Sequence, residues 1–239
     1  GVDTKFIERH RGLLRQWLDA VLPAHAIRAD EDHFERRYGL RYAEPHLHVR
    51  LLDPQLEREL GFPCSEFSLP LQTLAGLPVR AATVYVVENK VNLLTLPFLE
   101  RGLGLGGLGQ GVTLLRHIPW LQDAPIVYWG DLDVEGLGIL ASLRMIYPQT
   151  RSFLMGRAAL DRWRHLATAG TGRGPEVPAC LTEEEQAAWV RCRDENLRLE
   201  QERIPQPEVL EALGRLVAEQ SRAPSDGGPA TSSHPRTGR

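Results

Sequence analysis

Three acidic residues stand where two strand-like segments end. Glu88 follows the apolar run TVYVV (83–87), and Asp131 and Asp133 follow PIVYW (125–129). Ligands bind open parallel sheets outside the carboxyl ends of the strands, so neighbouring strands would bring the three carboxylates to one edge. Carboxylate oxygens are the ligands that Mg²⁺ prefers, and Mg²⁺ keeps positions open for substrate phosphates. The spacing therefore predicts a Mg²⁺ site, which Mn²⁺ could also occupy, with Glu88 as a third ligand or as the general acid or base.

Each acid taken alone also has a purely structural explanation. Asp131 would then N-cap the helix that follows it, and Glu88 would cap the helix that begins near Lys90. Three acids on two strand ends, with Asp131, Asp133 and Gly136 in the spacing DxDxxG, favour the metal site.

Four further residues are weaker candidates for the same site. Glu200 and Glu202 lie on an expected helix, where residues two apart point in different directions, so at most one can face the site. Glu202 is the candidate additional metal ligand, and salt bridges along the helix are the alternative. Lys90 and Arg144 are candidate contacts for DNA phosphates, although either could pair with a nearby acid instead.

A glycine pattern resembles a nucleotide-binding motif but lies in the wrong place. Gly104, Gly106 and Gly109 satisfy GxGxxG, yet that motif must directly follow a buried strand to bind a dinucleotide. The expectation here is a flexible glycine loop.

Composition excludes several classes of protein. The chain is 42% hydrophobic with a net charge of −3, and its apolar runs are far shorter than the roughly 18 residues of a membrane span. We therefore expect no membrane partner. Three cysteines without CxxC spacing argue against zinc and for the reducing cytoplasm.

Alternating strands and helices predict an α/β fold with a parallel sheet flanked by helices. The expected strands are 83–87, 125–129 and 151–155, and the expected helices are 6–21, 30–38, 90–96, 134–146, 158–166, 191–203 and 208–220. Thr182 and Glu185 have the spacing of a capping box that begins a further helix. From about Ser221 the sequence is rich in Ser, Pro and Gly, which predicts disorder.

The acidic motifs resemble a known domain. VENK (87–90) and GDLDVEG (130–136) are similar to the Toprim domain, which topoisomerases, primases and several nucleases share. More narrowly, the chain resembles the JetD family of Wadjet anti-plasmid systems, which is related to topoisomerase VI. The motifs that carry this resemblance are GVDTKFIE (1–8), YWGDLD (128–133), SFLM (152–155) and RLEQERI (198–204).

The resemblance implies a domain order. A helical connector over 1–60 would follow an N-terminal arm that is missing here, and the Toprim catalytic domain would span 61–168. A helical extension over 169–220 would pack on that domain, and 221–239 would be a disordered tail.

The resemblance also implies a function. Glu88, Asp131 and Asp133 would be the catalytic acids in Mg²⁺-dependent cleavage of closed circular double-stranded DNA. The protein would work with a condensin-like SMC motor complex and form a homodimer. One departure is Gly156, because the family usually has an acid there.

Two other functions remain open. A break-forming enzyme of the topoisomerase VI type would attack DNA through an upstream tyrosine, and Tyr38 and Tyr42 lie upstream, although nothing marks either as a nucleophile. A DNA-binding module without activity is the second alternative, but such a module gains nothing from acids beside phosphate.

Overall fold

The fold divides into two units. The computed structural model describes residues 4–42, 44–171, 174 and 176–222. Contacts between Cα atoms separate Gly1–Pro45 from His46–Arg239.

The first unit is a small helical element. It contains α1 (Thr4–Val21), the 3₁₀ turn η1 (Ala24–Ala26) and α2 (Phe34–Arg37). Asp19 joins α1 to α2, because its carboxylate accepts hydrogen bonds from the Arg37 guanidinium at 3.0 Å and from the Tyr38 hydroxyl at 2.7 Å. The helix expected over 6–21 is present as α1. The helix expected over 30–38 is shorter and covers only α2.

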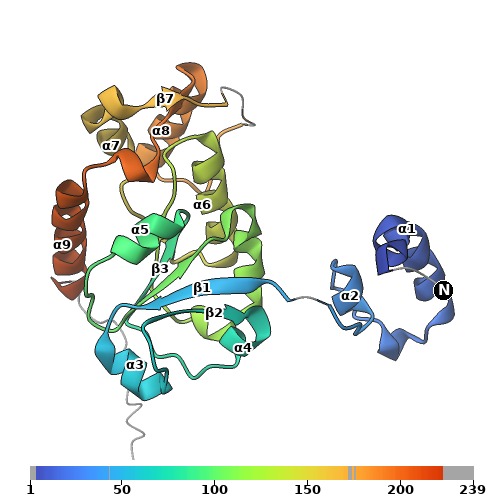
Figure 1. Cartoon of the computed structure of the whole chain (residues 1–239). Coiled ribbons are helices and arrows are strands. Elements are labelled where there is room, and N and C mark those ends of the chain that lie inside the picture. Colours follow the sequence, from blue (N-terminus) through green and yellow to red (C-terminus); the bar gives the residue numbers. More distant parts are fainter. Residues whose placement is uncertain (1–3, 43, 172–173, 175, 223–239) are drawn as a thin grey trace, which may run out of the picture. The chain divides into compact units, whose positions relative to one another are not determined.

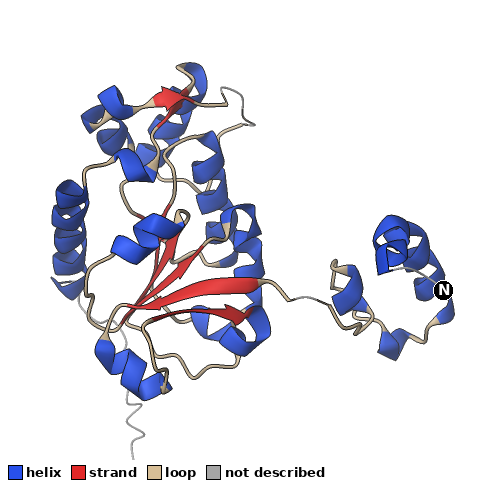
Figure 2. Ribbon diagram, in the orientation of Figure 1, coloured by secondary structure: helices blue, strands red, loops and turns tan. Residues whose placement is uncertain are grey.

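A six-stranded mixed sheet forms the centre of the second unit (Figures 1 and 2). The strands lie in the order β2-β1-β4-β3-β5-β6. They are β1 (His46–Leu51), β2 (Glu66–Pro70), β3 (Thr83–Val87), β4 (Gly102–Gly106), β5 (Ile126–Trp129) and β6 (Arg151–Ser152). β4, β3, β5 and β6 are parallel, whereas β1 and β2 form an antiparallel pair at one edge. The α/β fold is thus confirmed, with an antiparallel addition that was not predicted.

The sheet unit begins earlier in the chain than expected. β1 starts at His46 and pairs with β4, so the division falls after Pro45 and not after residue 60. Leu47, Val49 and Leu51 are buried while His48 and Arg50 between them are partly exposed, which is the pattern of a strand with one covered face. The segment from 46 to 60, which forms β1 and α3, therefore belongs to the second unit and not to a helical connector.

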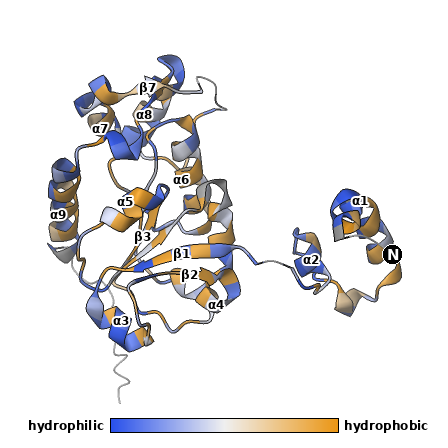
Figure 3. Cartoon of the chain, viewed as in Figure 1, coloured by the Kyte–Doolittle hydropathy of each residue, from blue (hydrophilic) through white to orange (hydrophobic). Residues whose placement is uncertain are grey.

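Helices cover the sheet and join its strands. They are α3 (Pro54–Leu60), α4 (Leu71–Ala75), α5 (Lys90–Thr95), η2 (Gly109–His117), η3 (Pro119–Leu121), α6 (Val134–Ile146), α7 (Arg157–Arg162), η4 (Arg164–Leu166), α8 (Glu183–Asp194), η5 (Gln201–Arg203) and α9 (Gln206–Arg222). A two-stranded sheet pairs β7 (Thr168–Ala169) with β8 (Leu197–Arg198). Apolar residues concentrate on the central strands (Figure 3), and the C-terminal helices join the same core through Trp189 and Leu213.

The glycine-rich segment is a central strand, so the expectation of a flexible loop is wrong for β4. Leu103 and Leu105 are fully buried, while Gly104 and Gly106 face Leu93 of α5. A Cβ atom at Gly104 would lie 2.5 Å from one Leu93 methyl carbon, and one at Gly106 would lie 2.6 Å from the other. The glycines therefore allow α5 to pack closely on the sheet.

Local signals predicted several elements accurately. β3 and α6 have the expected bounds, and the capping box of Thr182 and Glu185 begins α8. The helix expected over 191–203 is wrong, because α8 ends at Asp194 and Asn196 adopts a positive φ of 53° that leads the chain into β8.

Other expected elements are shorter or divided. The strand expected over 151–155 covers only two residues, and the helix expected over 158–166 is split into α7 and η4. α9 reaches Arg222, and the disorder predicted for the tail falls on 223–239, which lie outside the described residues. Within the described part of the chain, none of the helices has the length and apolar character needed to cross a membrane.

Candidate functional site

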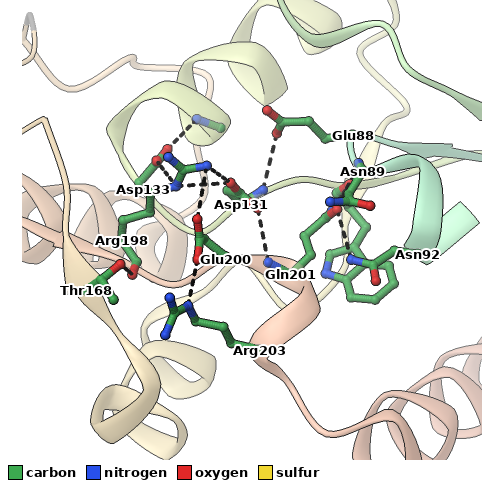
Figure 4. Close-up of polar contacts among 12 residues, drawn as sticks. Glu88, Asn89, Asn92, Asp131, Asp133, Thr168, Arg198, Glu200, Gln201 and Arg203 are labelled. Carbon is green, nitrogen blue, oxygen red and sulfur yellow. Dashed lines mark hydrogen bonds and ion pairs between the residues drawn. The ribbon is translucent and has the colours of Figure 1, made fainter.

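Glu88 and Asp131 lie next to each other at the carboxyl ends of β3 and β5. These strands are parallel neighbours with Val87 paired to Trp129, so the residues that follow them are adjacent. The backbone amide of Asp131 donates a hydrogen bond to Glu88 Oε2 at 3.2 Å, and the Tyr128 hydroxyl donates to the same oxygen at 3.3 Å. The structure thus brings two of the three predicted acids to one edge of the sheet (Figure 4).

Two glycines make room for this arrangement. A Cβ atom at Gly130 would collide with the Tyr128 hydroxyl and lie 2.8 Å from Glu88 Oε2. A Cβ atom at Gly136 would collide with the backbone carbonyl of Asp131. Gly130 therefore leaves room for Glu88 beside the end of β5, and Gly136 allows the first turn of α6 to pack against the backbone of Asp131.

The N-caps of α5 and α6 are not the residues that the sequence indicated. Asp133 is the N-cap of α6, since its Oδ1 accepts a hydrogen bond from the amide three residues on at 2.7 Å. Asn89 is the N-cap of α5 and accepts from the amide two residues on at 2.7 Å. Asp131 and Glu88 are not caps, so capping does not explain their presence at the strand ends.

Arg198 is the cation that contacts both aspartates. Its Nη2 lies 2.6 Å from Asp131 Oδ2, and its Nε lies 3.5 Å from Asp133 Oδ2. Nη2 is also 3.6 Å from Glu200 Oε1. The sequence signal that could have found Arg198 is its place in RLEQERI, but the expected helix assigned it to a surface salt bridge.

Gln201 connects the separate parts of the site and was not predicted. Its side-chain Oε1 accepts hydrogen bonds from the Asn89 amide at 3.0 Å and from Asn92 Nδ2 at 3.2 Å, and its Nε2 donates to the carbonyl of Trp129. Its backbone amide donates to Asp131 Oδ1 at 3.0 Å. One buried residue thus fixes the loop after β3, the end of β5 and the carboxylate of Asp131 (Figure 4).

Burial and like charge perturb the acids of the site. Burial raises the pKa of the Glu88 carboxyl above its usual value, and the negative charge of Asp131 raises it further. Burial also raises the pKa of Asp133, although the hydrogen bond from its capped amide opposes that change. The hydrogen bond to Asp131 raises the pKa of Arg198, so this guanidinium stays charged. The site therefore holds more negative charge than Arg198 neutralises.

A comparison with known protein families gives a match that includes the residues of this site. The family model described as Wadjet protein JetD, C-terminal, matches residues 39–213. The chain belongs to this JetD family. The match covers all six strands of the sheet and the segments that carry Glu88, Asp131 and Arg198. It confirms the resemblance that the sequence motifs indicated and identifies the chain as a component of a Wadjet system. A search of curated proteins gives no match.

The JetD-family site does not include Arg144. Its guanidinium lies 2.7 Å from Glu185 Oε2 and donates to the carbonyls of Cys180 at 2.8 Å and Thr150 at 3.1 Å. The side chain is largely buried, so Arg144 forms the ion pair that was the alternative to a phosphate contact. Lys90 differs, because it is exposed at the start of α5 and makes no ion pair with another described residue.

Glu200 and not Glu202 is the glutamate beside the aspartates. The segment is a single 3₁₀ turn, in which Glu202 is exposed. Glu200 precedes that turn and contacts Arg198, as well as Arg203 at 2.6 Å. The helical geometry assumed for this pair was therefore wrong, and Glu202 has no described contact with the site.

The donor atoms fit a hard divalent cation, although they are not arranged to hold one as they stand. Asp131, Asp133 and Glu88 supply carboxylate oxygens, and their like charges are incompletely neutralised, which a cation would relieve. Among the described residues no group of three or more His, Cys, Asp or Glu side chains converges on a metal position. Arg198 lies between the two aspartates, so ion binding requires this side chain to move.

Proposed function

We propose that this chain is the metal-dependent DNA endonuclease subunit of a Wadjet system, and that it cleaves closed circular double-stranded DNA. The observation that carries the proposal is the pair of adjacent acids, Glu88 and Asp131, on neighbouring parallel strands of a JetD-family chain. Capping explains neither acid, and a protein that only bound DNA would be weakened by carboxylates beside phosphate.

Asp131 and Asp133 would hold Mg²⁺ or Mn²⁺, with Glu88 as a third ligand or as the proton-transfer group. When bound, the ion would stabilise negative charge on the phosphoryl oxygens. Glu88 is suited to proton transfer because its raised pKa brings its exchange closer to neutral pH. The Tyr128 hydroxyl orients the Glu88 carboxylate, and the Gln201 amide orients that of Asp131.

The partners in this proposal are DNA, a condensin-like SMC motor complex and a second copy of the chain, acting in the cytoplasm. Lys90 is the proposed phosphate contact because it is exposed two residues after Glu88. The net charge of −3 provides no general attraction to DNA, so delivery by a motor complex would compensate for weak intrinsic binding.

Hydrolysis is favoured over attack by a tyrosine. The Tyr38 hydroxyl donates to Asp19 and also contacts the Arg15 carbonyl at 3.1 Å, and the Tyr42 hydroxyl accepts from Arg36 at 2.7 Å. Both phenols are thus engaged within the N-terminal unit.

The test is cleavage of a supercoiled plasmid by the full-length protein together with its SMC partners, in Mg²⁺, Mn²⁺ or EDTA. Glu88→Gln and Asp131→Asn should abolish cleavage with the fold intact. Asp123→Asn is the matched control, because Asp123 is an exposed aspartate that precedes β5, whereas Asp131 follows it. Its activity should equal that of the wild type.

Three results would contradict the proposal. An intact plasmid after incubation with the complete wild-type complex would exclude the nuclease. A covalent adduct between the protein and DNA would indicate a tyrosine nucleophile. Tight DNA binding that EDTA does not change, without cleavage, would indicate a binding module.

A further inference from the structure

Arg198 occupies the position between the two aspartates that a cation would take. Its guanidinium contacts Asp131 at 2.6 Å and Asp133 at 3.5 Å, and both carboxylates are at least nine-tenths buried. A single positive charge in contact with two buried carboxylates acts as their counterion. The same two side chains are the proposed ligands of the divalent ion, so the guanidinium and the ion cannot both occupy this position.

The Arg198 side chain can leave without opening the core. It is 43% exposed, so it reaches the buried carboxylates from the solvent side. The backbone beside Arg198 is held by contacts that do not involve its side chain. Leu199 exchanges hydrogen bonds of 2.9 and 3.1 Å with Leu132, the residue between the two aspartates in the sequence. Rotation of the side chain therefore disturbs neither this bridge nor β8.

A second acceptor for the guanidinium is already in place. Glu200 Oε1 lies 3.6 Å from Arg198 Nη2, while Glu200 Oε2 is bound by Arg203 at 2.6 Å (Figure 4). A small rotation would transfer Arg198 from the aspartates to Glu200, where its charge remains paired. Glu200 is thus placed to form an ion pair with Arg198 after that side chain leaves the aspartates.

We infer that Arg198 is a built-in competitor of the divalent cation, which neutralises Asp131 and Asp133 in the metal-free protein and moves to Glu200 when the ion binds. This inference rests on the proposed function, because it assigns a regulatory role at the same site. The affinity of the site for the divalent ion then depends on the position of the Arg198 side chain. A partner or a DNA phosphate that draws Arg198 away would raise the affinity for the ion, so the site would hold the ion more tightly when the complex is engaged.

The test is calorimetric titration of the full chain with MnCl₂ at pH 8, together with thermal unfolding in EDTA and in Mn²⁺. The variants are Arg198→Gln, which removes the competing charge, and Arg198→Lys, which keeps it. Arg193→Gln is the matched control, because Arg193 pairs with Asp194 at 2.8 Å and has no described contact with Glu200 or with either aspartate. Asp131→Asn reports whether the titrated site is the proposed one.

Arg198→Gln should bind Mn²⁺ at least about tenfold more tightly than the wild type, because the ion no longer has to displace a guanidinium that is paired with the same carboxylates. Its Tm should fall in EDTA and recover in Mn²⁺. Arg193→Gln should match the wild type, and Arg198→Lys should lie between the wild type and Arg198→Gln.

The failure of this inference and that of the proposed function give different results. If the wild type binds Mn²⁺, Asp131→Asn loses binding, and Arg198→Gln binds no more tightly than the wild type, Arg198 is not a competitor and the inference is overturned. A fall in Tm without tighter binding shows a merely structural arginine and has the same consequence. If Asp131→Asn binds like the wild type, or no form binds, the proposed metal site itself is wrong.

Discussion

Gln201 provides the sharpest test of how the site is held together, through the substitution Gln201→Ala. The side chain is 1% exposed and makes three hydrogen bonds, accepting from the Asn89 amide and from Asn92 Nδ2 and donating to the Trp129 carbonyl. Alanine removes all three and leaves the Asn89 amide and Asn92 Nδ2 without an acceptor, whereas the Trp129 carbonyl still accepts from the Glu88 amide at 3.0 Å. The backbone hydrogen bond from residue 201 to Asp131 does not require the side chain.

The expected loss follows from these contacts. A typical intramolecular hydrogen bond contributes about 1 kcal/mol net, and a buried group left unsatisfied costs about 1–3 kcal/mol. Three lost bonds therefore predict a decrease of about 3–5 kcal/mol in the free energy of unfolding. Because native proteins are stable by only about 5–15 kcal/mol, a loss of this size is readily measured.

The assay is urea unfolding in EDTA, with Gln206→Ala as the matched control. Gln206 makes one exposed hydrogen bond, to the Thr95 carbonyl at 3.1 Å, so its loss should cost about 0.5 kcal/mol. Gln201→Leu separates hydrogen bonding from packing, because it fills a similar volume without polar atoms. A free energy of unfolding for Gln201→Ala within error of that for Gln206→Ala, or a Gln201→Leu variant as stable as the wild type, would refute the reasoning.

Two further predictions concern Glu88 and β4. Since the pKa of Glu88 is raised in the folded state, the folded protein binds more protons than the unfolded chain, and wild-type stability should fall with rising pH relative to Glu88→Gln. Urea unfolding from pH 4 to 8 in EDTA should show Glu88→Gln as the more stable form at neutral pH, with the difference vanishing in acid; a difference of opposite sign would contradict it. Gly104→Ala should cost about 1–3 kcal/mol by collision with Leu93, whereas Gly12→Ala, in open space on α1, should stabilise by about 0.5–1 kcal/mol. Equal effects at the two glycines, measured by the same unfolding assay, would show that α5 does not pack on β4 as described.

Local patterns predicted the elements that carry the acids, because their signals lie within a few residues. The β-branched run 83–87 became β3 with its expected bounds, and the strand before Asp131 lies beside it. The general rule for parallel sheets then sufficed to place Glu88 next to Asp131. The capping box of Thr182 and Glu185 was equally local.

Elements defined by their neighbours were missed. β4 has no β-branched residue, and its glycines are explained only by Leu93 packing against them from α5. β1 alternates polar and apolar residues, and its His48 pairs with Glu66 of β2 at 3.0 Å, a contact that no spacing in the sequence indicates. In both cases the partner is distant in the chain.

The same distinction explains why the sequence predicted the position of the acids but not the residues that contact them. An acid after a buried strand is visible in the sequence, but Arg198 and Gln201 reach the site because the chain leaves α8 through the positive φ of Asn196 and pairs Leu199 with Leu132. The site is thus built from two parts, the ends of β3 and β5, which supply the acids, and the segment after α8, which neutralises and orients them. The second part is joined to the first by the bridge at Leu132, by the hydrogen bonds of Gln201 and by the buried side chains of Leu199 and Ile204, so packing in the shared core fixes its position as well as the polar contacts do.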